Sequence, residues 1–319
     1  MQRRIFLKNG AFALVTMGLS PTFLRRTVMG MELPNVAKGK ILICLFQRGA
    51  ADALNVVVPH GEAEYYKMRP RIAIPQPTKG GNLAAIDLDG FFGLHPSLGT
   101  LAPLYKRGML APIVAVGSPS STRSHFDAQD YMESGTPVIK GTPDGWLNRY
   151  LATCGTCEAH ASPHASPFRG VAFAPQSPRI MQGSQETVVM NSIDEFTVRA
   201  AGSQVERLEA LYRTGTTDLV HGAGQEMFDA VKMLKDANPQ KYIPQNGAAY
   251  GNTQFGLRLK QIAQLIRSDV GLEVAFADIG GWDTHQNQGN TTGQLAGRMN
   301  EFAPAIAAFT AAPRCGLKA

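Results

Sequence analysis

The stretch that decides the fold is Leu272-Glu273-Val274-Ala275-Phe276-Ala277-Asp278-Ile279-Gly280-Gly281-Trp282-Asp283-Thr284-His285. Its apolar first half predicts a buried strand, and the glycine pair lets the backbone turn sharply where that strand ends. Asp283 and His285 follow as a carboxylate and an imidazole two residues apart, a pairing typical of metal sites. Open α/β sheets bind ligands at the carboxyl ends of their strands, so the stretch predicts a functional edge.

Strands and helices alternate along the rest of the chain. Apolar runs predict strands at 40–46, 111–117, 171–174 and 188–191, and apolar periodicity predicts helices at 95–107, 124–133, 203–214, 225–237 and 255–266. This alternation favours an α/β domain of three layers, in which helices cover both faces of a mainly parallel sheet. The length of the chain suits one large domain, which we assign to residues 38–310.

The net charge of +6 comes from the first forty residues. They hold seven Lys and Arg and one Glu, so of 31 basic and 25 acidic residues in the chain, 24 and 24 remain in the body. A neutral body gives no indication of a nucleic-acid partner.

The N-terminal segment 1–37 resembles a twin-arginine export signal. Arg3-Arg4 and Phe6-Leu7-Lys8 precede an apolar stretch at 11–19 that is too short for an ordinary transmembrane helix. We therefore expect the twin-arginine export machinery as a partner and a periplasmic or cell-envelope location. An uncleaved leader that anchors the protein is the alternative.

The four cysteines are too few for a disulfide framework in a chain of this size. Cys44 lies in an apolar strand and is interpreted as a small buried residue. Cys154 and Cys157, followed by His160 and His164, have a spacing that zinc sites use. Their surroundings lack apolar periodicity, so a surface loop with a local disulfide or free thiols is favoured over zinc.

Three loops are expected at the carboxyl edge of the sheet. They carry Asp52, the run Ser121-Thr122-Arg123-Ser124-His125, and the pair Asp283 and His285. Asp52, Asp283 and His285 offer two oxygens and a nitrogen to a divalent ion such as zinc, calcium or manganese. Asp52 and Asp283 also have structural interpretations, because Asp52 can cap a turn and Asp283 can hydrogen-bond its own loop.

Ser124 is expected at the start of a helix. Free N–H groups and the helix dipole favour an anion there, and the neighbouring Arg123 can pair with two oxygens of an ester. The structural alternative is that Ser124 is only the helix N-cap.

Several motifs in order resemble the bacterial exported domain of unknown function numbered 1501. They are the leader, Arg48-Gly49-Ala50-Ala51-Asp52-Ala53-Leu54-Asn55, Leu94-His95-Pro96, Ser124-His125-Phe126-Asp127-Ala128-Gln129 and Gly280-Gly281-Trp282-Asp283-Thr284-His285. That family is similar to the alkaline phosphatase and sulfatase superfamily, whose members hydrolyse phosphate or sulfate esters with divalent metals. The resemblance implies a fold more firmly than a substrate.

The resemblance also implies roles. Asp52, Asp283 and His285 would be metal ligands, and Ser124 the leading nucleophile, ahead of Thr122 and Ser121. Arg123 would hold the ester oxygens, and His125 would be an acid or base. His95 either lines the same cleft or, the favoured interpretation, bonds to backbone at a helix start. Small anionic esters, or sulfated or phosphorylated glycans, would be the substrates.

The family pattern is not complete in this sequence. Its Ser-Glu-Phe-Gly-Arg-Thr and Asp-His-Gly motifs are absent, and residues 311–319 form an unrelated tail. We expect a truncated or frameshifted product whose metal site lacks ligands, and a loss of activity would follow from the missing motifs. The alternative functions are a non-catalytic exported protein that binds anions or glycans, and a pseudoenzyme fragment.

Overall fold

A four-stranded parallel sheet organises the computed structural model, which describes residues 40–78, 81–154, 166–197 and 219–312. The strand order is β1-β7-β5-β6, and every pairing is parallel. The strands are β1 (Leu42–Gln47), β5 (Gly170–Phe173), β6 (Val188–Met190) and β7 (Val274–Ile279). The predicted α/β class with a mainly parallel sheet is confirmed.

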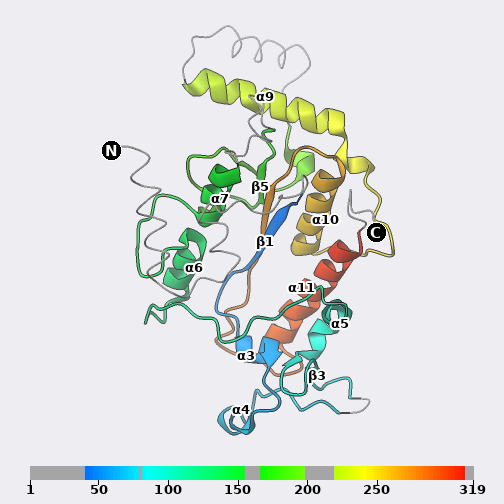
Figure 1. Cartoon of the computed structure of the whole chain (residues 1–319). Helices are drawn as coiled ribbons and strands as arrows, with labels where there is room; N and C mark the ends of the chain where they lie inside the picture. The colour runs from blue at the N-terminus through cyan, green and yellow to red at the C-terminus, as the bar shows by residue number, and fades with distance from the viewer. Residues whose placement is uncertain (1–39, 79–80, 155–165, 198–218, 313–319) are drawn as a thin grey trace.

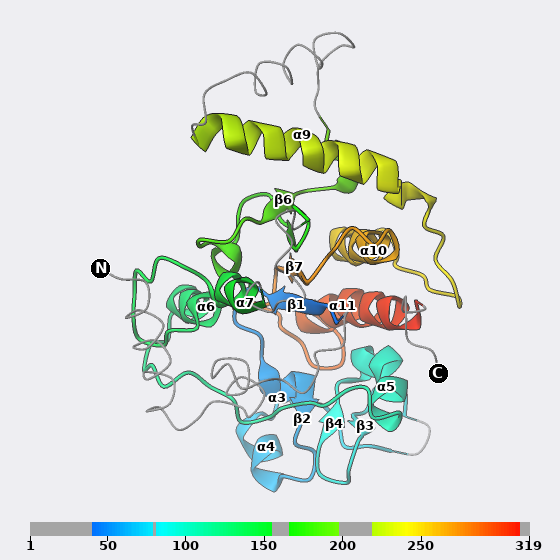
Figure 2. The same cartoon turned by 45° about the horizontal axis from the view of Figure 1, so that its top comes forward.

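Helices surround this sheet. They are α3 (Ala53–Val56), α4 (Ala63–Met68), α5 (Ala102–Lys106), α6 (His125–Ser134), α7 (Trp146–Cys154), α9 (Leu219–Ala237), α10 (Gln254–Arg267) and α11 (Gln294–Ala311), with 3-10 turns η1 (Pro96–Leu101), η3 (Arg179–Met181), η4 (Ile193–Glu195) and η5 (Pro239–Lys241). Figures 1 and 2 show α6 and α7 on one side of the sheet and α10 and α11 on the other. The predicted helix at 203–214, the leader and the Cys157, His160 and His164 side chains lie outside the described residues.

Side chains that alternate along the strands point to opposite faces of the sheet, and both faces are buried. Val171, Phe173, Ala275 and Ala277 share a core with residues of α10 and α11. The alternate strand positions Ala172, Val274 and Phe276, with Cys44, pack against Leu147 and Leu151 of α7 on the other face. Burial on both sides explains why β5 is a continuous apolar run and why β7 is apolar apart from Asp278. Burial also raises the pKa of the Cys44 thiol to about 11, which removes it as a thiolate nucleophile.

A small antiparallel sheet in the order β2-β4-β3 lies beyond the carboxyl end of β1 (Figure 1). Its strands are β2 (Val57–Val58), β3 (Ile86–Asp87) and β4 (Gly93–Leu94). Val58 of β2 and Tyr65 of α4 form a satellite core with Ile74 and Ala85. This sheet was not predicted, because strands of two residues are too short to show an alternating pattern.

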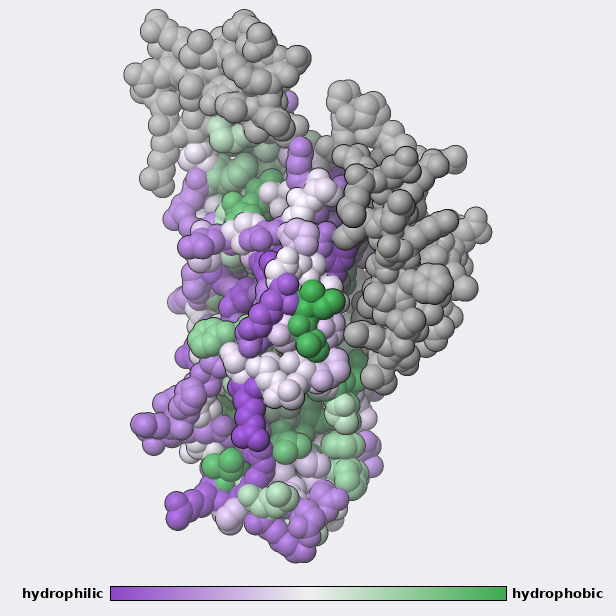
Figure 3. Space-filling model, turned by 90° about the vertical axis from the view of Figure 1, so that its left-hand side faces the viewer, coloured by the Kyte–Doolittle hydropathy of each residue, from purple (hydrophilic) through white to green (hydrophobic). Residues whose placement is uncertain are grey.

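The predicted strand at 111–117 is wrong. No strand is assigned to these residues, and Ile113 and Val116 are 73% and 74% exposed. Pro112 has no N–H to donate to a ladder, and Ala115 has a φ of 56°, which lies outside the β region. The side chains therefore stay at the surface, and Figure 3 shows hydrophobic residues among hydrophilic ones on the face that carries α6.

None of the helices in the described ranges is both long and apolar enough to cross a membrane.

Gly49 allows the loop after β1 to approach the loop after β7. Its φ is +124°, and a Cβ built there would lie 2.7 Å from the backbone nitrogen of Asp283. The obstacle is backbone, which cannot turn aside as a flexible side chain does. Gly49 thus fixes how closely the two loops meet.

We predict that Gly49→Ala destabilises the protein by about 1–3 kcal/mol, the usual cost of a strained backbone conformation. Urea unfolding measures this change. The matched control is Gly117→Ala, because a Cβ at Gly117 meets nothing within 4 Å. Equal effects of the two substitutions would contradict the close approach of the loops.

Candidate functional site

The loops that follow β1 and β7 lie side by side at the carboxyl edge of the sheet. The Arg48 N–H donates to the Ile279 carbonyl at 2.9 Å, and the Trp282 N–H donates to the Arg48 carbonyl at 3.4 Å. Gly281, with a φ of +84°, makes the turn after β7. Two of the three predicted loops therefore meet at one edge, as parallel pairing requires.

Asp283 lies between two imidazoles. Its Oδ2 is 2.9 Å from Nε2 of His285 and 3.7 Å from Nδ1 of His125. His285 is 81% exposed, whereas Asp283 and His125 are about a quarter exposed. The His125 ring also lies against Phe126, with 4.1 Å between ring centroids. The structure thus joins the predicted pair Asp283 and His285 to the predicted acid or base His125.

Asp52 is engaged elsewhere. Its Oδ2 accepts hydrogen bonds from Nη1 of Arg69 and Nε2 of Gln288, each at 2.6 Å. Gln288 in turn accepts from the Thr284 hydroxyl at 3.0 Å, which ties Asp52 to the loop that carries Asp283. Asp52 makes no hydrogen bond or ion pair with Asp283 or His285 among the described residues. Its place in the structure is that of an anchor between loops.

Ser124 is the N-cap of α6. Its Oγ accepts from the Asp127 N–H at 3.4 Å, and the helix ends at Gly135 in the left-handed conformation. Thr122 precedes it and accepts from the Ser124 N–H while donating to the Asp127 carboxylate. Ser124 is thus the N-cap, as its structural interpretation predicted, and among the described residues its hydroxyl donates to no acceptor.

Arg123 and Ser121 are exposed on the loop before α6. In the described part of the chain, Arg123 forms no ion pair, so its guanidinium is free to meet an anion near Ser124. The loop does not follow a strand, because 111–117 is not one. His125, which follows this loop, nevertheless lies at the sheet edge, with its Nδ1 3.7 Å from Oδ2 of Asp283.

No group of three or more His, Cys, Asp or Glu side chains within the described ranges is arranged to hold a metal ion. Asp283, His285 and His125 nevertheless supply one carboxylate and two imidazoles, which are the donor types that zinc and similar ions use. Asp52 bonds instead to Arg69 and Gln288, and its role as a further ligand stays a prediction. The donor chemistry fits a divalent ion, and the side chains would have to close around it.

A network of arginines and carboxylates beside the site was missed by sequence reasoning. Arg48 donates to Asp278 and, at 2.7 Å, to Glu133 on α6, while Arg258 on α10 donates to Asp278 at 2.6 Å. Glu133 also accepts from the Ile180 N–H. The signal was present in the sequence, because Asp278 is a lone charge within an apolar strand and a buried charge needs a partner.

His95 is fully buried and bonds to backbone on both sides, as the favoured interpretation predicted. Its Nδ1 accepts from the Ser97 N–H at 3.0 Å, and its Nε2 faces the Asn290 carbonyl at 2.8 Å. The first contact requires an unprotonated Nδ1, so the ring is neutral with its proton on Nε2. His95 thereby connects the start of η1 to the loop 285–293.

Comparison with known proteins identifies one family. Residues 39–312 match the family described as "Protein of unknown function (DUF1501)". No curated protein and no solved structure matches the chain.

We predict that Asp278→Ala lowers the free energy of unfolding by about 3 kcal/mol or more, because it leaves Arg258 buried without its carboxylate. Denaturant unfolding measures the loss. The control is Glu64→Ala, which removes an exposed pair with Lys67 and should cost less than about 1 kcal/mol. A similarly small loss for Asp278→Ala would show that the network contributes little.

We predict that His95 makes the fold sensitive to acid. Burial lowers its pKa from 6.5, so the unfolded chain binds a proton at a higher pH than the folded chain. The contribution of neutral His95 is complete above pH 6.5 and is lost as the pH falls below it. Below pH 6.5, the free energy of unfolding should decrease less steeply with falling pH in His95→Asn than in the unchanged protein. Identical slopes below pH 6.5 would refute this role.

Proposed function

The chain belongs to the DUF1501 family of proteins of unknown function, and from this premise we propose that it is a metal-dependent hydrolase of phosphate or sulfate esters. The observation that carries the proposal is the contact of Asp283 with both His125 and His285. These side chains come from two separate motifs and meet at the sheet edge where α/β enzymes bind their ligands. The parallel sheet with helices on both faces is compatible with the proposed alkaline phosphatase-like fold.

Asp283, His285 and His125 would hold the ion. A divalent ion bound there would lower the pKa of a hydroxyl or water and draw charge from the ester. Zinc or manganese suits one carboxylate with two imidazoles better than calcium does, because calcium takes oxygen ligands. Asp52, held by Arg69 and Gln288, would keep the Asp283 loop in position.

The remaining residues would bind and orient the substrate. Arg123 and the first N–H groups of α6 would hold the ester oxygens, since guanidinium and helix N-terminus both favour oxyanions. The Ser124 hydroxyl, kept at the helix start by its cap, would be the attacking group.

The proposal includes export. The twin-arginine-like leader would deliver the protein to the periplasm or cell envelope, where small phosphate or sulfate esters, including modified glycans, are the proposed substrates. Twin-arginine export carries folded proteins, so the ion would be bound before export.

The first test is elemental analysis of the folded protein beside the double variant Asp283→Ala with His285→Ala. We expect a divalent ion in the unchanged protein and its loss from the double variant. Asp236→Ala on α9, an exposed position, is the control and should keep the ion. Hydrolysis of a generic aryl phosphate or aryl sulfate would then name the reaction.

Two results would overturn the proposal. A metal content that the double variant leaves unchanged would place the ion elsewhere. Absence of metal, with anion binding unaffected by Asp283→Ala, would instead identify a non-catalytic binding protein.

A further inference from the structure

The outer edge of β1 has no partner strand among the described residues. β1 is the last strand in the order β1-β7-β5-β6, and the N–H of Leu42 donates to the carbonyl of Glu273 on the β7 side. Because a strand in a parallel pair bonds its neighbour through alternate residues, the backbone groups of Ile43, Leu45 and Gln47 point to the open edge. Within the described ranges these groups form no hydrogen bond.

The composition of β1 is that of an interior strand. Edge strands in natural proteins usually carry charges, a proline or a bulge, which prevent pairing with another chain. β1 has the sequence Leu-Ile-Cys-Leu-Phe-Gln and contains none of these. All six of its residues are half-buried, whereas five of the six residues of β7 are buried. β1 thus combines an interior composition with an edge position.

A second segment of the chain has a strand composition and no strand partner. Residues 111–117, Ala-Pro-Ile-Val-Ala-Val-Gly, form no backbone hydrogen bond with the described part of the chain. Ile113 and Val116 are 73% and 74% exposed. Ala115 has a φ of 56°, an unfavourable value for a residue with a Cβ that an extended conformation would relieve. The segment and the open edge of β1 are therefore complementary, because both are uncharged and both lack backbone partners.

The connection from β1 leads toward this edge. The chain passes from β1 through η1 and α5, whose leucines share a core with α10 and α11. On the same face, α10 carries the chain from β6 to β7, which is the direction toward β1. A crossover of the same hand on that face takes the chain from β1 to the position beyond it. Figure 2 shows the segment between α5 and α6 crossing the molecule on the side of β1 that faces away from β7.

We propose that residues 111–117 add to the open edge of β1 as a fifth parallel strand, and that the conformation with this segment exposed is the open state of a strap. In the closed state the free backbone groups of β1 gain partners, and Ile113 and Val116 are covered by the helices on the two faces of the sheet. Pro112 is compatible with the outermost strand, because its missing N–H is tolerated where the strand faces solvent. The pairing does not depend on the proposed hydrolase activity.

Closure has a consequence for the candidate site. A fifth strand that ends at Gly117 places residues 118–124 at the carboxyl edge of the sheet, as parallel pairing requires. Arg123 and Ser124 then lie beside the loop that carries Asp283, which His125 already approaches. The chain continues through α6 and α7 on the opposite face to β5, and this return on the other face keeps the same hand.

The test is amide hydrogen exchange in the full chain, followed by NMR at Ile43, Leu45 and Gln47. A closed state that holds about nine tenths of the molecules slows exchange at these amides about tenfold. Ile113→Lys should abolish this slowing, because closure would bury the new charge between the helix layers. The matched control is Ile243→Lys, since Ile243 is 76% exposed, and it should leave exchange unchanged.

Two further measurements make the result specific. The Leu42 amide, which bonds on the β7 side, should stay protected in both variants and so shows that the fold is intact. Cross-strand NOEs between the Leu45 amide and residues 113–116, independent of protein concentration, would place the segment at the edge. Equal exchange in the unchanged protein, Ile113→Lys and Ile243→Lys would overturn the proposal. Protection that disappears on dilution would overturn it as well, because the partner of β1 would then be a second copy of the chain.

Discussion

The ion pairs of Asp278 join the parts of the molecule on which the candidate site depends. This carboxylate ends β7 and accepts hydrogen bonds from Arg48, directly after β1, and from Arg258 on α10. Arg48 extends the connection to Glu133 on α6. One network thus fixes two strand ends, a helix from each face of the sheet and, through α6, the position of His125. Each buried charge of this kind is neutralised by its partner. Removing one of them leaves the other uncompensated and destabilises the fold.

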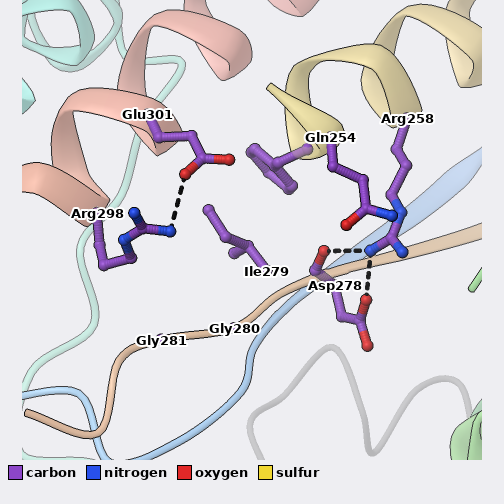
Figure 4. A pocket seen from close by; sticks show the side chains of 9 residues that line it. Gln254, Arg258, Asp278, Ile279, Gly280, Gly281, Arg298 and Glu301 are labelled. Carbon is purple, nitrogen blue, oxygen red and sulfur yellow. Dashed lines mark hydrogen bonds and ion pairs between the residues drawn. The ribbon is translucent and has the colours of Figure 1, made fainter. Parts of the chain in front are cut away.

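The Gly280-Gly281 turn separates two different environments. On one side, Asp283 and two histidines form a partly exposed group with the donor types of a metal site. On the other, the N-terminal turn of α10, the end of β7 and residues Arg298 and Glu301 of α11 line a pocket (Figure 4). Both arise from the same fact of topology: α10 and β7 are antiparallel neighbours, so a strand end and a helix start meet at one edge.

Features that depend on a long apolar pattern were predictable from the sequence. β1, β7 and α10 each follow such a pattern. The sharp turn at Gly281 was also predicted, because glycine readily adopts a positive φ. The segment 111–117 was wrongly predicted as a strand from its apolar composition. The backbone there is not extended, because Pro112 has no N–H to donate and Ala115 has a positive φ. The partners of Asp52 were equally out of reach, since Arg69 and Gln288 lie in segments without periodicity.

The pairing of β1 with β7 also determines the order in which the chain can fold. Leu42 to Gln47 align with Val274 to Ile279, so the first strand finds its only described neighbour after most of the chain has been made. Closing a loop of that length costs entropy before any contact repays it, which makes such a topology slow to form. Until β7 arrives, β1 is an apolar strand with both edges open. A newly made chain is therefore most vulnerable to aggregation through its own first strand, and a chaperone that covers β1 would protect it.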